Sequence, residues 1–449
     1  MNTKTIGNQQ TNIISFVKNY ILRCKKIGVD VANSSICYFI NSANSPGAAT
    51  LRNKFKGNKY FLKYLKVIFL NIFAISQLSN YYTLKKKKNK KFKKLIISNS
   101  VRENFKKNGS YFDSYFQLNS RETKDCLWFL NCVDNFVPDK FDDNLIIFTK
   151  KNKLFNINLI FFFKRFFKCL YKSKFSFKKV FNEFSFLTEF SNIITNKVLL
   201  EIKNGNFEKI INSYEAQPFQ NNIFDKVKKI NKEIKTIGFY HTTLHPMPTG
   251  LIYRSGSPDL LLISGNEQKK YLVKNLNWPN NKIKIIPSFR YKKNNMLNMS
   301  GFIFLPYDFF SSNKIIYQFK NYLKSKKNYS INFLKIRNHP HRSNSKKHLV
   351  LIKKLEKVLV EYKNKFSKKI KRKYSVFIGS TSSIILALEL KVDVVHICED
   401  PIFDSYSQRL WKGLKINHIN DNMFEYRLKK RGSFIKFSDK NYSIKQNFI

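Results

Sequence analysis

Four segments decide the fold: TIGFYH (236–241), DLLLIS (259–264), NEQKKYLVKNL (266–276) and IKII (283–286). The first, second and fourth are short apolar runs of the kind that form buried strands. The third has the length and apolar spacing of a helix. Short strands that alternate with helices of ten or more residues are typical of βαβ units, so this stretch predicts a mostly parallel sheet.

The same alternation continues on both sides of this stretch. Toward the N-terminus we expect strands at Leu95–Ser98 and Leu145–Thr149. Toward the C-terminus we expect strands at Phe302–Leu305, Asn332–Ile336, Tyr374–Ile378 and Val394–Ile397, separated by helices. We therefore predict an α/β protein with an irregular or helical N-terminal extension (1–90) and two domains (91–290 and 291–449) that face a cleft.

The composition fits this size and limits the classes of function. The chain has 449 residues and a formal net charge of +54, and 13 of its 83 basic residues are Arg. Bidentate readout of phosphates and bases favours Arg, whereas abundant Lys, Asn, Ile, Phe and Tyr indicate compositional drift toward A and T in the genome. We therefore predict no dedicated nucleic-acid surface. The six cysteines form no CxxC pair, which indicates a reducing compartment without a disulfide framework.

Two apolar stretches bear on membrane association. Phe61–Leu78 and Asn158–Leu170 are interrupted by Lys or Arg and are shorter than the roughly 20 apolar residues that cross a bilayer. We expect both to be core helices, the alternative being Lys-rimmed amphipathic helices on an anionic surface. The first ten residues lack the apolar core of a secretory signal. We expect a cytoplasmic protein that can rest on the inner face of the cytoplasmic membrane.

A Ser-rich segment follows one of the predicted strands. Gly379, Ser380, Thr381, Ser382 and Ser383 stand where Tyr374–Ile378 passes into a helix. Hydroxyls and backbone N–H groups at the start of a helix suit phosphate, and glycine permits a tight turn. The segment lacks the spacing of a P-loop, and the alternative is simple capping of the helix.

Other polar residues also follow predicted strands. His339-Pro340 comes directly after one strand, and Glu215 and His241 follow two others. Because ligands of open α/β sheets bind at the carboxyl ends of strands, His339 is a candidate for phosphate contact. Glu215 and His241 are candidates to take a proton from a hydroxyl, the alternatives being a helix cap and polar loop residues. The spacing of the histidines and acids indicates no metal site.

An ordered set of motifs resembles a known family. The motifs are Tyr214-Glu215…Pro218, Gly238-Phe239-Tyr240-His241, Pro258-Asp259-Leu260…Gly265, Lys282-Ile283…Ser288-Phe289-Arg290, His339-Pro340 and Gly379–Ser383…Glu389. The set resembles bacterial surface-carbohydrate biosynthesis proteins of the GT-B glycosyltransferase type, from O-antigen and capsule clusters. His-Pro followed by a Ser-rich loop is also similar to bacterial sialyl- and polysialyltransferases.

The resemblance implies a fold, an activity and partners. It implies two Rossmann-like domains, the first for the acceptor and the second for the nucleotide-sugar. It places Arg290, His339, Ser380–Ser383 and Glu389 at the donor. The acidic-acidic-Gly motif of the polysialyl enzymes is not found, and Ile397 stands where a second Glu would follow Glu389.

The sequence thus predicts a metal-independent glycosyltransferase that uses a nucleotide-sugar donor and no cofactor. Its acceptor would be a growing surface polysaccharide or a lipid-linked glycan, and its excess charge would suit an anionic membrane surface. Two alternatives share the fold, a nucleotide-sugar epimerase and a polyol-phosphate transferase. An alternative of another class is a basic protein that binds nucleic acid or another polyanion.

Overall fold

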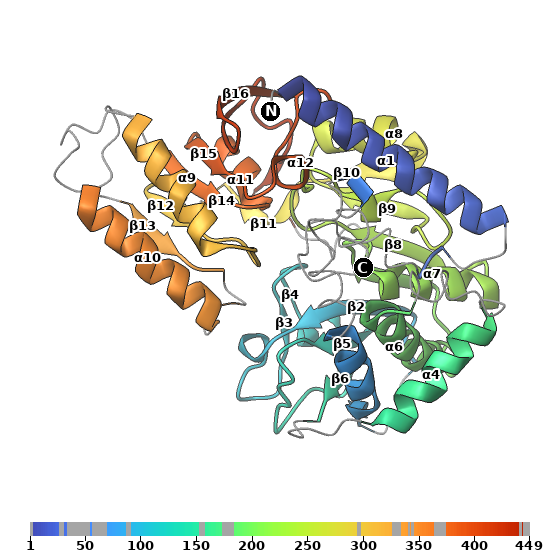
Figure 1. Cartoon of the computed structure of the whole chain (residues 1–449). Coiled ribbons are helices and arrows are strands. Elements are labelled where there is room, and N and C mark those ends of the chain that lie inside the picture. The colour runs from blue at the N-terminus through green and yellow to red at the C-terminus, as the bar shows by residue number, and fades with distance from the viewer. Residues whose placement is uncertain are drawn as a thin grey trace.

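The fold is of the α/β class, with helices packed around two main β-sheets (Figure 1). The computed structural model describes residues 3–26, 31–33, 54–55, 70–86, 91–151, 158–172, 184–293, 298–325, 334–339, 342, 345–362, 374–439 and 442. The α-helices with bounds inside these ranges are α1 (Thr3–Lys26), α4 (Leu159–Lys172), α6 (Phe186–Lys203), α7 (Pro218–Ile230), α8 (Asn266–Leu276), α9 (Ser312–Ser325), α10 (Lys346–Tyr362), α11 (Ser383–Glu389) and α12 (Pro401–Asp404).

The first sheet has, among the described residues, eight strands in the order β1-β6-β5-β2-β7-β8-β9-β10. They are β1 (Tyr81–Lys85), β2 (Lys94–Ser100), β5 (Cys126–Cys132), β6 (Leu145–Lys150), β7 (Lys209–Ser213), β8 (Lys235–Phe239), β9 (Leu260–Ile263) and β10 (Ile283–Ile285). β1 runs antiparallel to β6, and the other neighbouring pairs are parallel. Every residue of β5 is buried, as expected for a central strand of a parallel sheet.

The second sheet has six strands within the described ranges, in the order β13-β12-β14-β15-β17-β16. They are β12 (Phe302–Phe304), β13 (Lys335–Arg337), β14 (Tyr374–Ile378), β15 (Asp393–Ile397), β16 (Leu414–Asn420) and β17 (Met423–Leu428). β13, β12, β14 and β15 are parallel, and β17 is antiparallel to both of its neighbours. Two short pairs complete the strands: β3 (Phe112–Asp113) with β4 (Leu118–Asn119), and β11 (Ser288–Lys292) with β18 (Phe437–Ser438).

The predicted α/β class is confirmed, and the alternation around 236–286 is reproduced closely in β8, β9, α8 and β10. Asn332–Ile336 corresponds to β13, but only its last three residues lie inside the described ranges. The domain boundaries stay predictions, although the chain does not divide sharply at them. β1 lies inside the predicted extension 1–90 yet pairs with β6, and the boundary between 290 and 291 falls within β11.

α1 joins the two halves of the molecule. The Gln10 side chain donates to the carbonyls of Ile402 (2.9 Å) and Ser405 (2.7 Å), and the Lys18 ammonium donates to Asn277 Oδ1 (2.8 Å). In Figure 1 this helix runs across the top of the molecule from α12 to the helices beside the first sheet. One buried hydrophobic cluster accordingly combines Ile13 of α1 with side chains of both halves, such as Ile210 and Ile385.

The expectation of a core helix at Asn158–Leu170 is wrong. These residues form most of α4, in which Leu170 is the one buried side chain among those the structure describes. Of the other stretch, Phe61–Leu78, residues before Leu70 lie outside the described ranges. No helix in the described part of the chain has both the length and the apolarity needed to span a bilayer.

Candidate functional site

Glu215 and His241 lie together at one edge of the first sheet. They follow the neighbouring parallel strands β7 and β8, whose last residues, Ser213 and Phe239, are register partners. Glu215 Oε1 is 3.6 Å from His241 Nε2. The Gln217 side chain donates to Glu215 Oε2 (3.1 Å), while the Glu215 backbone N–H donates to a glutamine of α7. The carboxylate is thus held beside the imidazole by the turn that starts α7.

Burial sets the charge of both groups. Burial raises the pKa of Glu215, whereas the Gln217 amide and the Arg290 guanidinium act in the opposite direction. Burial lowers the pKa of His241 to about 3, and Arg290 and His245 add to the effect. His241 is therefore neutral near neutral pH, so its contact with Glu215 is not an ion pair, and 3.6 Å is too long for a hydrogen bond. Its buried Nδ1 has no hydrogen-bond partner among the described residues.

Tyr115 belongs to this site, although the sequence analysis did not identify it. Its ring centroid lies 4.1 Å from that of His241. Burial and then the Glu215 charge raise the pKa of its hydroxyl, which therefore stays protonated. Asp113 holds the loop, because its wholly buried carboxylate accepts from the N–H groups of Tyr115 (2.8 Å) and Phe116 (2.7 Å) and from the Tyr111 hydroxyl (2.6 Å). The one available signal was the polar, aromatic run 110–116 between predicted strands.

Arg290 lies beside the same group of residues. It is exposed on β11, and its positive charge affects the pKa values of Glu215, His241 and Tyr115. The structure therefore brings this predicted donor-binding residue to the two predicted catalytic residues. A guanidinium there can bind a phosphate or a carboxylate of a substrate.

The Ser-rich loop begins at Gly379, between β14 and α11. Gly379 has φ +65°, its N–H donates to Ile397 O (2.8 Å), and its carbonyl accepts from His396 Nε2 (2.7 Å). The Oγ of Ser380 is buried and lacks a hydrogen-bond partner within the described ranges. Thr381 Oγ1 accepts from the Ser383 N–H (3.2 Å), whereas Ser382, the N-cap residue of α11, makes no side-chain capping bond.

One hydrogen bond joins the loop after β8 of the first sheet to the Ser-rich loop of the second sheet. Thr243 Oγ1, two residues after His241, donates to the carbonyl oxygen of Ser382 at 2.8 Å. Nearby, the Tyr406 hydroxyl donates to Leu244 O (3.1 Å). Figure 1 accordingly shows β14 and α11 on the side of the second sheet that faces the first. The loop after β8 and the Ser-rich loop therefore form one junction between the sheets.

His339 lies farther along the edge of the second sheet. It follows β13, and β12 separates that strand from β14. The His339 ring packs edge-on against Tyr307, with 5.3 Å between centroids. Tyr307 follows Pro306, which a Cβ on Gly379 would approach to 3.1 Å. The loop after β12 therefore lies between His339 and the Ser-rich loop. Pro340, the other half of the predicted motif, is outside the described residues.

Glu389 is engaged by the backbone of a distant segment. Its buried carboxylate accepts from the N–H groups of Gly432 (2.7 Å), Phe434 (3.0 Å) and Ile435 (3.2 Å). These contacts favour a structural role, in which Glu389 fixes the segment that leads to β18. The donor contact implied by the resemblance stays a prediction.

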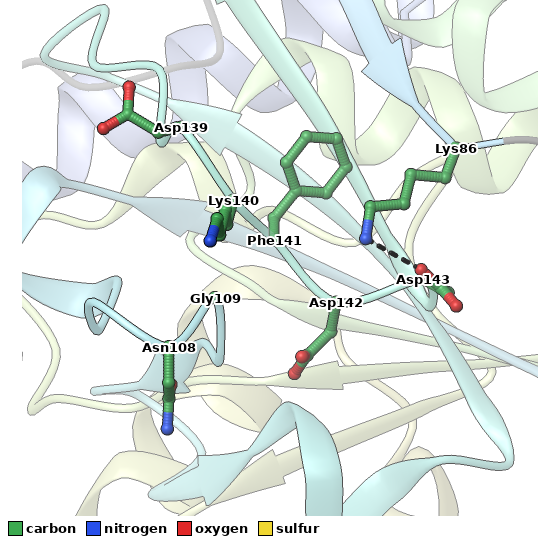
Figure 2. A pocket seen from close by; sticks show the side chains of 8 residues that line it. All are labelled: Lys86, Asn108, Gly109, Asp139, Lys140, Phe141, Asp142 and Asp143. Carbon is green, nitrogen blue, oxygen red and sulfur yellow. Dashed lines mark hydrogen bonds and ion pairs between the residues drawn. The ribbon is translucent and has the colours of Figure 1, made fainter.

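A surface pocket lies elsewhere, at the amino-terminal edge of the first sheet (Figure 2). Its volume is about 320 Å³, and it is lined by Lys86, Asn108, Gly109 and residues 139–143. Its Lys86 ammonium pairs with Asp143 at 2.9 Å, and the predicted site residues lie at the opposite edge. Within the described ranges, no three His, Cys, Asp or Glu side chains are grouped so that they could hold a metal ion.

Comparison of the chain with models of protein families and with curated proteins finds no match. The function is therefore inferred from the residues of this chain. Those residues form two polar groups. Tyr115, Glu215, His241 and Arg290 gather near the carboxyl ends of β7 and β8, and residues 379–383 follow β14. The bond between Thr243 and Ser382 connects the two groups.

Proposed function

We propose that the protein is a metal-independent glycosyltransferase with two Rossmann-like domains of the GT-B type. It would transfer a sugar from a nucleotide-sugar to a growing surface polysaccharide or a lipid-linked glycan. The supporting observation is the bond from Thr243 Oγ1 to Ser382 O, at 2.8 Å. The bond connects the loop that follows His241 with the Ser-rich loop. It supports the proposal because ligands of open α/β sheets bind at the carboxyl ends of strands, which these loops follow.

The transfer requires a base at the acceptor hydroxyl, a role that suits Glu215. The hydroxyl oxygen forms a bond to the anomeric carbon as the bond between that carbon and the nucleotide phosphate breaks, and the hydroxyl proton passes to the carboxylate. Burial raises the pKa of Glu215, which makes it a stronger base than an exposed carboxylate. Neutral His241 and the protonated Tyr115 hydroxyl would position the acceptor beside it.

The second group would bind the leaving nucleotide. The Ser380 hydroxyl has no partner among the described residues, and a phosphate oxygen that accepts from it would satisfy that buried group. Arg290 adds a positive charge from β11. Donors placed where negative charge develops stabilise the transition state most.

The test is transfer from a panel of nucleotide-sugars by the wild type and by Glu215→Gln. We expect the variant to lose about a hundredfold or more in turnover, because it keeps the shape of the side chain but cannot take a proton. The wild-type rate should decrease when the pH is lowered below the raised pKa of Glu215, since the base is then protonated. The matched control is Glu361→Gln, which should keep full activity. Glu361 is half-exposed and pairs with Lys320 at 2.7 Å.

The donor site is tested separately. Full activity in the double variant His339→Ala/Ser382→Ala would overturn its assignment, because both residues are proposed to contact the donor phosphate. Full activity in Glu215→Gln would overturn the proposed base. Conversion of the donor without any acceptor, to an epimeric sugar, would instead identify an epimerase.

A further inference from the structure

The outward face of α4 carries a row of exposed apolar side chains. Five large side chains on this helix are strongly exposed: Leu159 (54%), Ile160 (83%), Phe163 (50%), Phe167 (61%) and Tyr171 (74%). Ile160, Phe163, Phe167 and Tyr171 follow each other at spacings of three and four residues, so they share one face of the helix. We call these four residues the α4 stripe. An exposed apolar row of this length on a helix is typical of an interaction surface.

The opposite face of α4 fixes its orientation. Arg165 pairs with Glu189 of α6, and both side chains are largely shielded from solvent. The rings of Phe162 and Phe166 lie 5.5 Å and 5.6 Å from that of Phe184, and Leu170 is buried. Figure 1 shows α4 at the outer edge of the molecule, beside α6. The stripe therefore points outward because a different face of the helix is already packed.

A second exposed apolar group adjoins the start of α4. The helical segment 70–76 carries Leu70 (47%), Ile72 (38%) and Phe73 (42%) as exposed side chains. It meets α4 where the Asn158 N–H donates to Ser76 O at 3.4 Å. The described parts of the two stretches that stood out as apolar in the sequence are thus neighbours on the surface.

The part of the chain that contains the α4 stripe is positively charged, which favours an anionic partner. Between Asp143 and Glu183 the chain has ten Lys or Arg residues and no acid. On α4 itself, Lys164 and Lys168 are exposed next to the stripe. Two copies of such a face would repel each other, whereas an amphipathic helix with Phe on one side and Lys beside it suits an anionic lipid surface.

We propose that α4 binds an anionic lipid bilayer, with the α4 stripe among the acyl chains and Lys164 and Lys168 at the headgroups. Apolar burial supplies one part of the affinity, and the attraction of each Lys to an anionic surface supplies the other part. The helix lies in the plane of the interface and does not cross the bilayer. This surface does not depend on the proposed transfer activity, since it lies on α4 and segment 70–76.

The test is co-sedimentation of the full chain with vesicles of phosphatidylcholine that contain about one third phosphatidylglycerol. Ile160→Ser/Phe163→Ser/Phe167→Ser should weaken partitioning at least about tenfold, because it removes most of the inserted apolar area. The matched control is Tyr317→Ser/Val350→Ser/Val360→Ser, at positions 63%, 49% and 72% exposed on α9 and α10. It should partition as the wild type does.

The depth to which α4 enters the bilayer is measured with a tryptophan placed on the helix. The native Trp128, Trp278 and Trp411 are buried, so brominated lipid should quench Phe167→Trp and leave the signal of Val360→Trp unchanged. Lys164→Gln/Lys168→Gln should weaken binding and reduce its dependence on salt.

The proposal is overturned if the wild type does not bind anionic vesicles, or if the serine triple variant binds as well as the control. It is also overturned if Phe167→Trp is not quenched. A dimer of the wild type in gel filtration that the triple variant loses would show that a second copy covers the stripe instead.

Discussion

At the scale of single residues, two glutamates show how local partners decide what a carboxylate does. Glu215 accepts a side-chain hydrogen bond from Gln217 and faces a neutral imidazole, which leaves it able to take a proton. Glu389 instead accepts from three backbone N–H groups of the segment 432–435. Backbone donors that lose such an acceptor in the interior are costly, so the second arrangement serves stability.

Glu389→Ala should therefore destabilise the fold by about 2–4 kcal/mol, because the buried N–H groups of Phe434 and Ile435 and the exposed one of Gly432 lose their acceptor. Thermal and urea unfolding measure the loss, and Glu389→Gln, which keeps one acceptor oxygen, should recover part of it. If Glu389 binds the donor instead, the alanine variant will melt normally and its KM for the nucleotide-sugar will rise.

The sequence could predict Glu215 and His241 because each follows an apolar strand, and parallel neighbours bring such positions to one edge. It could not predict Tyr115, whose place over His241 depends on a loop anchored by Asp113. Nor could it predict the Thr243–Ser382 bond, because that contact depends on how the two sheets are mounted relative to each other.

At the scale of elements, the turn from β14 into α11 requires a glycine at position 379. A Cβ on Gly379 would lie 3.1 Å from Pro306 Cβ and 3.3 Å from Pro306 Cγ, on a backbone with φ +65°. Gly432 has a similar φ of +69°, but a Cβ there would meet no atom within 4 Å. Comparing substitutions at the two glycines therefore distinguishes the cost of backbone strain from the cost of contact with the loop after β12.

Gly379→Ala and Gly432→Ala should both destabilise the fold by about 1–2 kcal/mol, because each forces an L-residue into the left-handed region. Gly379→Ala should cost about 1 kcal/mol more, since Pro306 must also move. Chemical denaturation measures the difference, and equal losses in the two variants would show that the Pro306 contact is unimportant.

Helices and strands were predictable where the spacing of apolar residues was clear within a short segment. β14 has the predicted bounds, Tyr374–Ile378, because a buried run ends abruptly at a glycine. β1 escaped prediction because its residues are half-buried at a sheet edge, where the apolar contrast is weak. The face of α4 that meets the protein was also unpredictable, because its orientation depends on the Arg165–Glu189 pair.

At the scale of the whole molecule, α1 and the buried cluster it joins hold the two sheets in one arrangement. The Gln10 side chain bonds two carbonyls near α12, and Ile13 and Val17 of α1 lie in the same buried cluster as Phe377 of the second sheet. The sequence predicted only an irregular or helical extension for residues 1–90. Its role is visible only when both halves are present, because each contributes part of the surface that α1 covers.

Three histidines whose pKa values are lowered in the folded chain should make the stability of the whole fold depend on pH. Burial lowers the pKa of His241 to about 3 and those of His245 and His396 to about 4, against an ordinary value of 6.5. Below pH 6.5 the unfolded chain binds protons that the folded chain does not, so stability falls as pH falls, and the loss continues to about pH 4. Burial raises the pKa of Asp113, Glu215 and Glu399 above their ordinary values of 3.8 and 4.5. The folded chain therefore takes up these protons at a higher pH than the unfolded chain does, and above about pH 4 this opposes the effect of the histidines.

We therefore expect the melting temperature to drop as the pH falls from about 7 to about 5. If all three histidines contribute fully, the free energy of unfolding changes by at most about 4 kcal/mol per pH unit. Differential scanning calorimetry across this range measures the slope. His396→Gln should lower it by about one third, because one titrating group is removed while an amide can still donate to Gly379 O. A melting temperature that stays constant between these pH values would contradict the expected net loss. It would mean either that the buried carboxyl groups offset the histidines in full or that the histidines take up protons without unfolding.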